Sequence, residues 1–596
     1  MVAHAQSATL IGVEARLIEV EVELTQGLPY FAIIGLGDAA VQEAKYRIQA
    51  ALRSCDIDLP HKRVTINLAP AALRKDGASL DLPMTMGLLI ALGIVRASQM
   101  ESCLALGELS LSGRLRPVRG VLPSATLARR LGLRRILVPL ENAAEAEALA
   151  PLETLGAASL KDVLRIVGVK TSGDAAPTRP ASVRGQQGEP SHGSAPEAPE
   201  ASDPCPPGLP SDATSSTEAA GSRGSAQGSS SDLARTPHRR PSLDMVDVRG
   251  QAIAKRAMEV AATGGHNILL IGSPGAGKTM LARRVPSILP ALSVEEQIEV
   301  TSIWSSAGLT VGGPGLVCER PFRAPHHSIS SAGLIGGGSS IRPGEISLAH
   351  RGVLFLDEMP ELPRRVLESL RQPLEEQKVV LSRARESVAF PADFMLVGAA
   401  NPCPCGWLGH PSGRCLCPDE SIRRYQGRIS GALLDRIDIV LMIPSLTSAE
   451  LLDEGTSPRS GHDPAPDDVA ATPSLATSTP ASKTTAVIAR PDTGVRESSL
   501  QIRARVVKAR AHALERSGHL NARLRGRELK RVATVDDEAR SILRRAIDQL
   551  QLSARSLERT IRVARTIADL NGQPKIHAPE IAEALQYRSR VPTSST

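Results

Sequence analysis

Aromatic residues are scarce in this chain of 596 residues, which has two Trp, four Tyr and five Phe. If the protein binds a nucleic acid, stacking of its bases on aromatic side chains can therefore contribute little to the affinity. The sequence also lacks a run of about 18 uncharged apolar residues, which a transmembrane helix needs. Its first 24 residues have neither a basic start nor an apolar core followed by a small-residue cleavage site. We therefore expect a cytoplasmic protein with no membrane partner.

Cysteine and net charge are also modest. Eight cysteines in a long chain without an export signal favour reduced thiols or metal ligands over disulfides. A net charge of +7 favours a polyanionic partner only weakly. The length exceeds what one core usually serves, and 42% hydrophobic residues can fill two or three domains.

Two stretches rich in Pro, Ser and Thr divide the chain. Residues 171–241 contain no aromatic residue and no isoleucine, and residues 453–497 have a similar composition. Such segments cannot bury enough apolar surface to offset their ordering entropy, so we expect a disordered linker and a disordered insertion. The predicted domains are then 1–170, 242–452 and 498–590.

The central domain contains a P-loop in the setting that phosphate binding requires. An apolar run from Ile268 to Ile271 leads into GSPGAGKT and then into a helical pattern. Glycines let backbone N–H groups curl around phosphates at the N-terminus of the following helix. We expect Lys278 to reach the β and γ phosphates and Thr279 to bind Mg²⁺. The predicted ATP-binding residues are Gly272, Ser273, Pro274, Gly275, Ala276, Gly277, Lys278 and Thr279.

Two further apolar runs end in polar residues that suit phosphoryl transfer. The run GVLFLDE ends in Asp357 and Glu358, and FMLVGAAN ends in Asn401. Strands that each deliver a polar residue at the carboxyl end are what an open α/β nucleotide-binding sheet provides. We expect Asp357 to hold Mg²⁺, Glu358 to polarise the attacking water, and Asn401 to sense the γ phosphate.

The chain resembles the AAA+ ATPases of the magnesium-chelatase-like clade, and specifically the YifB/ComM family. The matching stretches are RPFRAPHHSIS, LIGGG, RPGEISLAHRGVLFLDEMPEL, LRQPLEE, AANPCPCG, SGALLDRIDI and VARTIADL. The resemblance implies a central AAA+ P-loop α/β domain and a C-terminal helical lid. It also implies ATP and Mg²⁺ as cofactors, and a homo-hexameric ring with ATP bound between neighbouring subunits.

In such rings a cation from one subunit completes the next subunit's site. The resemblance assigns that role to Arg436, with Arg428 as a less favoured candidate, and a sensor role in the lid to Arg555. An arginine supplied across an interface can raise turnover about a thousandfold or more. The alternative for Arg436 is a structural ion pair with Asp435 or Asp438. Leu557, Ile561, Ala564 and Ala568 recur at helical spacing as a buried stripe, which leaves Arg555, Arg559 and Arg562 off that face.

The N-terminal domain resembles the α+β peptidase domain of Lon-type (S5) proteases. Ser79 lies in the stretch LRKDGASLDLP, a frame similar to the Lon active-site loop. A serine hydroxyl needs a base within reach to become a nucleophile. The position that matches the Lon lysine is Leu122, and Lys75 would have to fold back from the same loop. We therefore expect a Lon-like fold without proteolysis.

Four cysteines occur as two close pairs, Cys403 with Cys405 and Cys415 with Cys417. Two such pairs could surround one zinc ion tetrahedrally, although the spacing within each pair is tighter than usual. Reduced thiols that shape the loop after Asn401 are the competing interpretation.

Two basic features point to a nucleic-acid partner. Residues 501–531 carry ten Lys or Arg residues, which would bind phosphates if they faced a ring channel; a solvated helical face is at least as good an interpretation. A glycine-rich stretch before the second strand carries the other candidate DNA contacts, which are Arg320, Arg323, His326, His327 and Arg342.

Two functions fit these features. The family resemblance implies a DNA helicase or translocase that promotes branch migration of single-stranded or branched DNA in recombination or natural transformation. The alternative is a magnesium-chelatase motor that drives metal insertion with partner subunits. The CPCG cluster and the Lon-like domain favour the first function.

Overall fold

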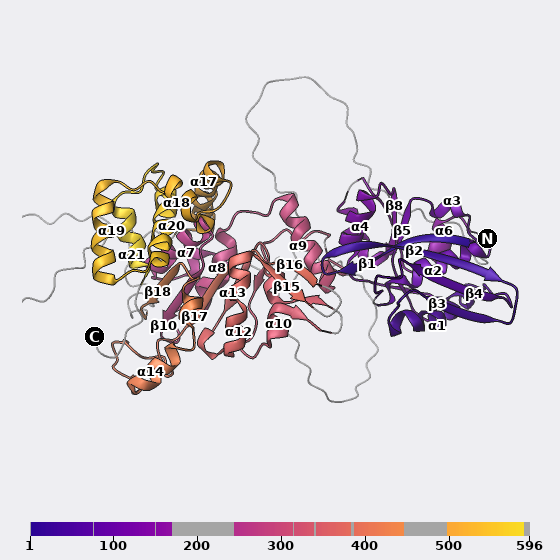
Figure 1. Ribbon diagram of the computed structural model, residues 1–596, viewed down its shortest axis with the longest axis horizontal. Helices are drawn as coiled ribbons and strands as arrows, with labels where there is room; N and C mark the ends of the chain where they lie inside the picture. The colour runs from indigo at the N-terminus through magenta and orange to yellow at the C-terminus, as the bar shows by residue number, and fades with distance from the viewer. Residues whose placement is uncertain are drawn as a thin grey trace, which may run out of the picture.

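The computed structural model describes residues 2–75, 77–149, 151–169, 243–313, 315–338, 341–382, 387–445 and 497–588. Figure 1 shows three regions along its long axis, with the N-terminal module in indigo at one end and the C-terminal helices in yellow at the other. The predicted linker and nearly all of the predicted insertion lie outside the described residues. Among the described helices, none is long and apolar enough to cross a bilayer.

The N-terminal module is built on a mixed seven-stranded sheet with the order β3-β4-β2-β1-β5-β8-β9. Its long strands β1 and β2 pair antiparallel, whereas β5, β8 and β9 run parallel. The strands of the sheet are β1 (Val2–Ile11), β2 (Glu14–Thr25), β3 (Tyr30–Ile34), β4 (Arg63–Ala69), β5 (Cys103–Ala105), β8 (Arg135–Pro139) and β9 (Glu153–Ala157). The short strands β6 (Glu108–Leu109) and β7 (Leu115–Arg116) form a separate pair.

Alternation along β2 explains why the sheet buries one face. Ile18, Val20 and Val22 are fully buried while Glu19 and Glu23 between and beyond them are exposed, the period-two pattern of a half-covered strand. The buried face packs on helix α2 (Asp81–Ala91), whose Leu82, Met84, Met86 and Leu88 are inaccessible to solvent. The other helices of the module are α1 (Ala39–Arg53), α3 (Ala97–Met100), α4 (Val121–Arg130), α5 (Ala143–Glu147) and α6 (Leu160–Ile166).

The central module contains a five-stranded parallel sheet with the order β11-β14-β17-β10-β18. The strands are β10 (Ile268–Gly272), β11 (Phe322–Arg323), β14 (Val353–Leu356), β17 (Met395–Ala400) and β18 (Ile439–Ile443). Because β10, β14 and β17 are fully buried, their sequences are continuous apolar runs. The α/β class predicted for this part of the chain is therefore confirmed.

Helices and two hairpins surround this sheet. The helices are α7 (Ala252–Gly264), α8 (Lys278–Ile288), α9 (Val294–Ala307), α10 (Ser331–Ile335), α11 (Glu345–Leu348), α12 (Arg364–Ser369), α13 (Arg371–Glu376), α14 (Asp419–Gln426) and α15 (Gly431–Leu434). One hairpin joins β12 (Gly336–Gly337) to β13 (Arg342–Pro343) within the glycine-rich stretch. The other joins β15 (Lys378–Ser382) to β16 (Ser387–Pro391) and follows α13 directly.

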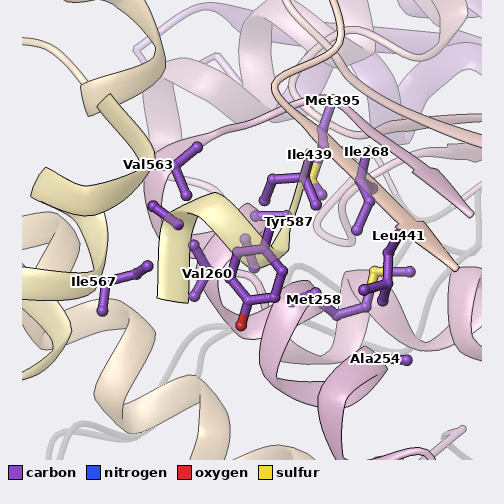
Figure 2. Packing of buried hydrophobic residues seen from close by; sticks show 14 of the residues in the cluster. Ala254, Met258, Val260, Ile268, Met395, Ile439, Leu441, Val563, Ile567 and Tyr587 are labelled. Carbon is purple, nitrogen blue, oxygen red and sulfur yellow. The ribbon is translucent and has the colours of Figure 1, made fainter. Parts of the chain in front are cut away.

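The C-terminal helices share one hydrophobic core with the central module. They are α17 (Ser499–Ser517), α18 (Gly526–Val532), α19 (Asp537–Leu550), α20 (Ala554–Leu570) and α21 (Ala578–Gln586). Figure 2 shows Val563, Ile567 and Tyr587 packed among residues of α7 and of strands β10 and β18. Tyr587 is 2% exposed in this shared cluster. The C-terminal helices and the central five-stranded sheet therefore stabilise each other.

The N-terminal module contacts the central module through a buried carboxylate and an apolar turn. Glu145, which is 2% exposed, accepts hydrogen bonds from the backbone N–H of Leu122 (2.8 Å) and the hydroxyl of Thr310 in the central module (2.9 Å). Burial raises the pKa of Glu145. Ile11 and Val13, at the β1–β2 turn, pack on the cluster that contains the β15–β16 hairpin.

Candidate active site

The P-loop connects β10 to α8, as the strand-loop-helix pattern predicts. Gly277 caps the helix with φ +88°, a conformation that a residue with a side chain adopts only with strain. The loop is held from outside by Gln251, whose side-chain amide donates to Ala276 O (3.3 Å) and Pro444 O (2.8 Å). Sequence reasoning did not find Gln251, because no charge or periodicity marks it.

The predicted Mg²⁺ ligands lie together. The Thr279 hydroxyl donates to Asp357 Oδ2 at 2.8 Å, although the two residues are 78 positions apart. Asp357 follows β14, and its other oxygen accepts the backbone N–H of Glu358 at 2.9 Å. Hydroxyl and carboxylate oxygens at one point suit a hard divalent cation that keeps several waters.

Lys278 and Asn401 meet at the same edge of the sheet. The Lys278 ammonium donates to Asn401 Oδ1 (3.1 Å) and to the carbonyl oxygens of Gly272 (2.6 Å) and Ser273 (3.0 Å). Burial lowers the pKa of Lys278, while the charges of Asp357 and Glu358 act in the opposite direction. The ammonium is therefore partly desolvated beside backbone amides that can bind phosphate.

Glu358 projects from this edge into solvent and has a histidine beside it. It adopts φ +46° two residues after the end of β14, and 52% of its side chain is exposed. His327 Nδ1 lies 3.6 Å from Glu358 Oε2, and the rings of His326 and His327 are 4.0 Å apart. His327, which we predicted as a DNA contact, therefore lies beside the carboxylate that we expect to polarise the attacking water.

Arg436 and Arg555 line one cavity of about 840 Å³ between the central module and the C-terminal helices. We call it the arginine cavity, because its walls also carry Arg320, Arg351, Arg510, Arg523, Arg525, Arg559 and Arg562. None of the P-loop residues 272–279 contributes to its lining. Arg555 is exposed, and its side chain has no ion pair or hydrogen bond with the residues that the structure describes.

The buried stripe of α20 differs from the predicted one. Ala564 and Ala568 are buried, whereas Leu557 and Ile561 are partly buried. Arg559, predicted off the buried face, is 2% exposed. Its guanidinium donates to Asp435 Oδ1 (2.7 Å) and to the carbonyl oxygens of Leu434 and Ile437. A partner on another element thus makes burial of this charge tolerable.

The candidate DNA contacts separate into two groups. The side chain of Arg320 is 9% exposed, and its guanidinium donates to Pro290 O, Arg351 O and Glu296. Arg323 makes two hydrogen bonds of 2.7 and 2.8 Å to Glu345. These internal contacts use the donors that a phosphate would need, so neither side chain is presented to a ligand. His326, His327 and Arg342 are exposed.

Much of the basic stretch 501–531 is also used internally. Arg505 pairs with Glu259 and Glu497, Arg516 with Asp569, and Arg523 with Asp393. Arg510 donates to Ala262 O, and burial lowers the pKa of its guanidinium to about 9. The contacts with Glu259, Asp393 and Ala262 attach the C-terminal helices to the central module, whereas the Arg516–Asp569 pair lies within those helices. The number of charges in the sequence therefore overstates the charge offered to a ligand.

The four cysteines of the loop 402–417, here called the cysteine loop, lie together. Their sulfur atoms all lie within 4.8 Å of one another, and three of the separations are 3.3, 3.7 and 3.7 Å. Burial alone would raise the pKa of Cys405, but hydrogen bonds from the Trp407 backbone and the other thiols lower it to about 7. A methyl group at Gly406, where φ is +81°, would lie 2.7 Å from Pro274 Cδ. The cysteine loop therefore rests against the P-loop.

Ser79 lines a second cavity, of about 830 Å³, between the N-terminal and central modules. Lys75 is fully buried, and its ammonium donates to Pro70 O at 2.5 Å. The Leu122 side chain is fully buried in the module's core. Neither residue of the predicted Lon-like site thus offers a base to Ser79.

The fold and the P-loop site have counterparts in known proteins. Three family models match: magnesium chelatase, subunit ChlI, at residues 244–451; subunit ChlI of Mg-chelatase at 20–142; and the ChlI C-terminal domain at 496–588. The chain is 36% identical to competence protein ComM of Haemophilus influenzae over 585 residues, 98% of this chain and 97% of the relative. It is 35% identical to the uncharacterized protein YifB of Escherichia coli over 588 residues, 99% of this chain and 97% of the relative.

A shorter match, 28% identical over 169 residues, is to the magnesium-chelatase 38 kDa subunit of Cereibacter sphaeroides and covers 26% of this chain and 51% of the relative. The fold and the P-loop site therefore define a magnesium-chelatase-like ATPase of the AAA+ class, a class that implies ATP and Mg²⁺. Within that class the chain belongs to the YifB/ComM family, as its sequence motifs predicted.

Proposed function

We propose that this protein is an ATP-driven ring motor that acts on DNA, and that it promotes branch migration in recombination or natural transformation. The observation that carries the proposal is the meeting of Lys278, Thr279, Asp357 and Asn401 at one sheet edge. It occurs in a chain that matches, over nearly its whole length, a relative named as a competence protein. DNA is the partner whose handling that name suggests.

Within one subunit, each residue has a distinct task. Lys278 neutralises the β and γ phosphates, and Thr279 with Asp357 holds Mg²⁺, which supplies charge stabilisation when bound. Glu358 orients and polarises the attacking water, because its exposed carboxylate lies at the open side of the edge. Asn401, already bonded to Lys278, aligns the γ phosphate with that water.

Across subunits, Arg436 and Arg555 complete the neighbour's site in a homo-hexameric ring. This is supported by their shared position in the arginine cavity, which contains no residue of the chain's own P-loop. A cation brought to the γ phosphate from another subunit stabilises charge that develops during transfer. ATP turnover would then require contacts between subunits, and a movement of one subunit would change the position of the arginines in the site of the next.

Contacts to DNA are proposed at the exposed part of the glycine-rich stretch. Arg342 lies on the β12–β13 hairpin, and His326 precedes it on the same segment. With few aromatic rings in the chain, such contacts would go to the phosphate backbone and would be largely independent of sequence.

We also propose that the cysteine loop holds a structural zinc ion. Four thiolates at about 2.3 Å from a tetrahedral zinc lie about 3.8 Å from one another. The separations of 3.3 to 3.7 Å between three of the sulfurs are close to that value. Cys403, Cys405, Cys415 and Cys417 would be the ligands, and the ion would close the loop against Pro274.

The N-terminal module is proposed to be Lon-like without peptidase activity, and to support the ring. The two positions considered for a base support the first part, since Lys75 is buried against Pro70 and Leu122 is apolar. The contacts of Glu145 and of the β1–β2 turn with the central module support the second.

The competing function is a magnesium-chelatase motor. It is supported by the match to the 38 kDa subunit, which covers 26% of the chain. Both functions use the same ATP machinery, so the test must vary the partner. Turnover of ATP is measured alone, with single-stranded DNA, with a branched DNA junction, and with the partner subunits of a magnesium chelatase.

The proposal predicts that DNA raises the rate and that the chelatase subunits do not. Arg342→Ala should weaken the response to DNA and reduce its salt dependence while leaving the basal rate unchanged. A rate that DNA leaves unchanged and chelatase subunits raise would contradict the proposal in favour of its competitor.

A further inference from the structure

Arg436 is held by a carboxylate that sequence reasoning did not find. Its Nη2 lies 2.6 Å from Glu375 Oε1, and its Nη1 donates to Ala432 O at 2.5 Å. The third nitrogen, Nε, has no hydrogen-bond partner among the described residues. The side chain of Arg436 is 18% exposed and that of Glu375 is 48% exposed. The contact therefore lies at the rim of the arginine cavity, where both residues form part of the lining.

The two carboxylates predicted as alternative partners of Arg436 bind other residues. Asp435 accepts from Arg559, and Asp438 binds His266 and Arg562. Although burial alone would raise the pKa of Asp438, the charge of Arg562 and the hydrogen bond from His266 lower it. The predicted alternative, an ion pair of Arg436 with Asp435 or Asp438, is therefore wrong. Glu375 is the carboxylate that faces Arg436 in the described structure.

The elements that carry the pair are fixed to each other. Glu375 lies on α13, and Arg436 follows α15. Arg371, at the start of α13, donates to the hydroxyl of Ser430, which caps α15, at 3.1 Å. Asn267 Nδ2 donates to the backbone oxygen of Arg436 at 3.0 Å. Glu375 can thus hold the guanidinium in one place relative to the sheet.

The geometry leaves donors free for a second anion. An arginine has five N–H donors, and the contacts with Glu375 and Ala432 occupy one each. Because Nε is buried, two unoccupied donors remain for a second anion, one on Nη1 and one on Nη2. A half-exposed ion pair is weak, so Glu375 does not cancel the attraction of the guanidinium for a triphosphate. The contact instead restricts a long and flexible side chain before that anion arrives.

We propose that Glu375 is a positioning residue for Arg436, which it holds at the subunit surface in the orientation that meets the neighbour's γ phosphate. The inference rests on the proposed function, in which Arg436 completes the site of an adjacent subunit. Glu375 acts through Arg436 and does not touch the nucleotide. Its loss should therefore lower kcat, through a less well placed guanidinium, and leave the KM for ATP unchanged.

The test compares Glu375→Ala and Glu375→Gln with the wild-type ring at saturating DNA. Glu375→Ala should lower kcat by about fivefold or more, because an unplaced catalytic group loses its effective concentration. Glu375→Gln keeps an oxygen that accepts from Nη2, so it should restore most of the rate. The matched control is Glu376→Gln, which removes the same charge from the adjacent exposed residue, whose contacts are with Lys378 and Gln372. It should leave kcat unchanged.

Two further variants show whether Glu375 acts through Arg436. The double variant Glu375→Ala with Arg436→Ala should turn over no more slowly than Arg436→Ala alone. Nucleotide affinity and ring size, measured with a fluorescent ATP analogue and by sedimentation, should match the wild type in Glu375→Ala and so show that it folds.

Each contrary result has a separate meaning. An unchanged kcat in Glu375→Ala, or a further loss in the double variant, would overturn the positioning role even if Arg436→Ala is inactive. Full turnover in Arg436→Ala would overturn the shared site of the proposed function, and the role of Glu375 with it.

Discussion

The ammonium of Lys278 lies 3.1 Å from the side-chain oxygen of Asn401, although 123 residues separate them in the sequence. Parallel strands β10 and β17 are hydrogen-bonded neighbours, so their carboxyl ends bring the two residues to one point. A phosphate at this point would meet both side chains at once. Because binding of the nucleotide is assigned to Lys278 and sensing of its γ phosphate to Asn401, substitutions at the two residues should affect different steps.

Replacing Lys278 should abolish tight nucleotide binding without unfolding the protein. The Lys278→Ala variant loses a charged partner of the phosphates, so we expect affinity for ATP to fall at least about tenfold. Asn401→Ala should retain nucleotide affinity and lose turnover by about a hundredfold, because it affects only the aligned water and γ phosphate. Equilibrium binding of a fluorescent nucleotide and steady-state turnover measure the two effects.

The control for these variants is Arg283→Ala, which removes an exposed cation from the same helix α8. It should bind and hydrolyse ATP normally. A Lys278→Ala protein that binds ATP as tightly as wild type would mean that the P-loop has been misidentified.

Subunit mixing tests whether the site is shared. Arg436→Ala should lower turnover about a thousandfold while its own P-loop stays intact. Lys278→Ala lacks a working P-loop but keeps Arg436. In equal mixtures about one quarter of the interfaces of a closed ring pair an intact P-loop with an intact Arg436. Turnover should therefore reappear on mixing, and a mixture no more active than its components would place Arg436 outside the neighbour's site.

Removal of metal tests the cysteine loop. The purified protein should release one zinc ion per chain when its thiols are modified, as a colorimetric chelator would measure. Cys403→Ser should lose that ion and lower the thermal midpoint, since closure of a loop against the P-loop depends on it. Cys55→Ala, a buried cysteine of the N-terminal module, should keep the ion. A wild-type protein free of zinc after preparation without chelators would favour reduced thiols.

Glu299 gives a prediction for pH. Hydrogen bonds from His350 and Arg351 lower its pKa to about 2, from an ordinary value of 4.5. A depressed carboxyl pKa stabilises the fold above pH 4.5, and that contribution is lost as pH falls toward 2. Because 46% of the Glu299 side chain is exposed, the contribution should be no more than about 1 kcal/mol.

The measurement compares the urea-unfolding midpoints of wild type and Glu299→Gln at neutral and acidic pH. Wild type should be more stable at pH 7, and the gap should shrink as the pH is lowered through 4. Glu101→Gln, at an exposed position, is the control and should show no gap. A gap that does not depend on pH would show that the carboxylate charge of Glu299 contributes nothing.

The parts of the site that the sequence predicts well are those fixed by short-range rules. Asp357 and Asn401 each follow a buried apolar run, so strand geometry alone places them at the sheet edge. The P-loop residues follow from glycine spacing between a strand and a helix. The alternation in β2 likewise predicts its buried face.

The rest depends on partners from distant elements. Arg559 can be buried because it pairs with Asp435. Arg320 can be buried because it donates to the carbonyl oxygens of Pro290, before α9, and Arg351, after α11. Charge in the sequence marked both as surface residues. Glu375 lies in the motif LRQPLEE, but the motif does not indicate its role, because its contact with Arg436 exists only once α13 and α15 are packed together.

The most direct test of a DNA motor is strand exchange on a synthetic four-way junction, followed by gel electrophoresis with wild type, Lys278→Ala and Arg436→Ala. We expect wild type to convert the junction to duplex products only when ATP is hydrolysed, and both variants to leave it intact although they are folded. Junctions left intact by a wild-type ring that hydrolyses ATP, or converted equally well by Lys278→Ala, would contradict this expectation.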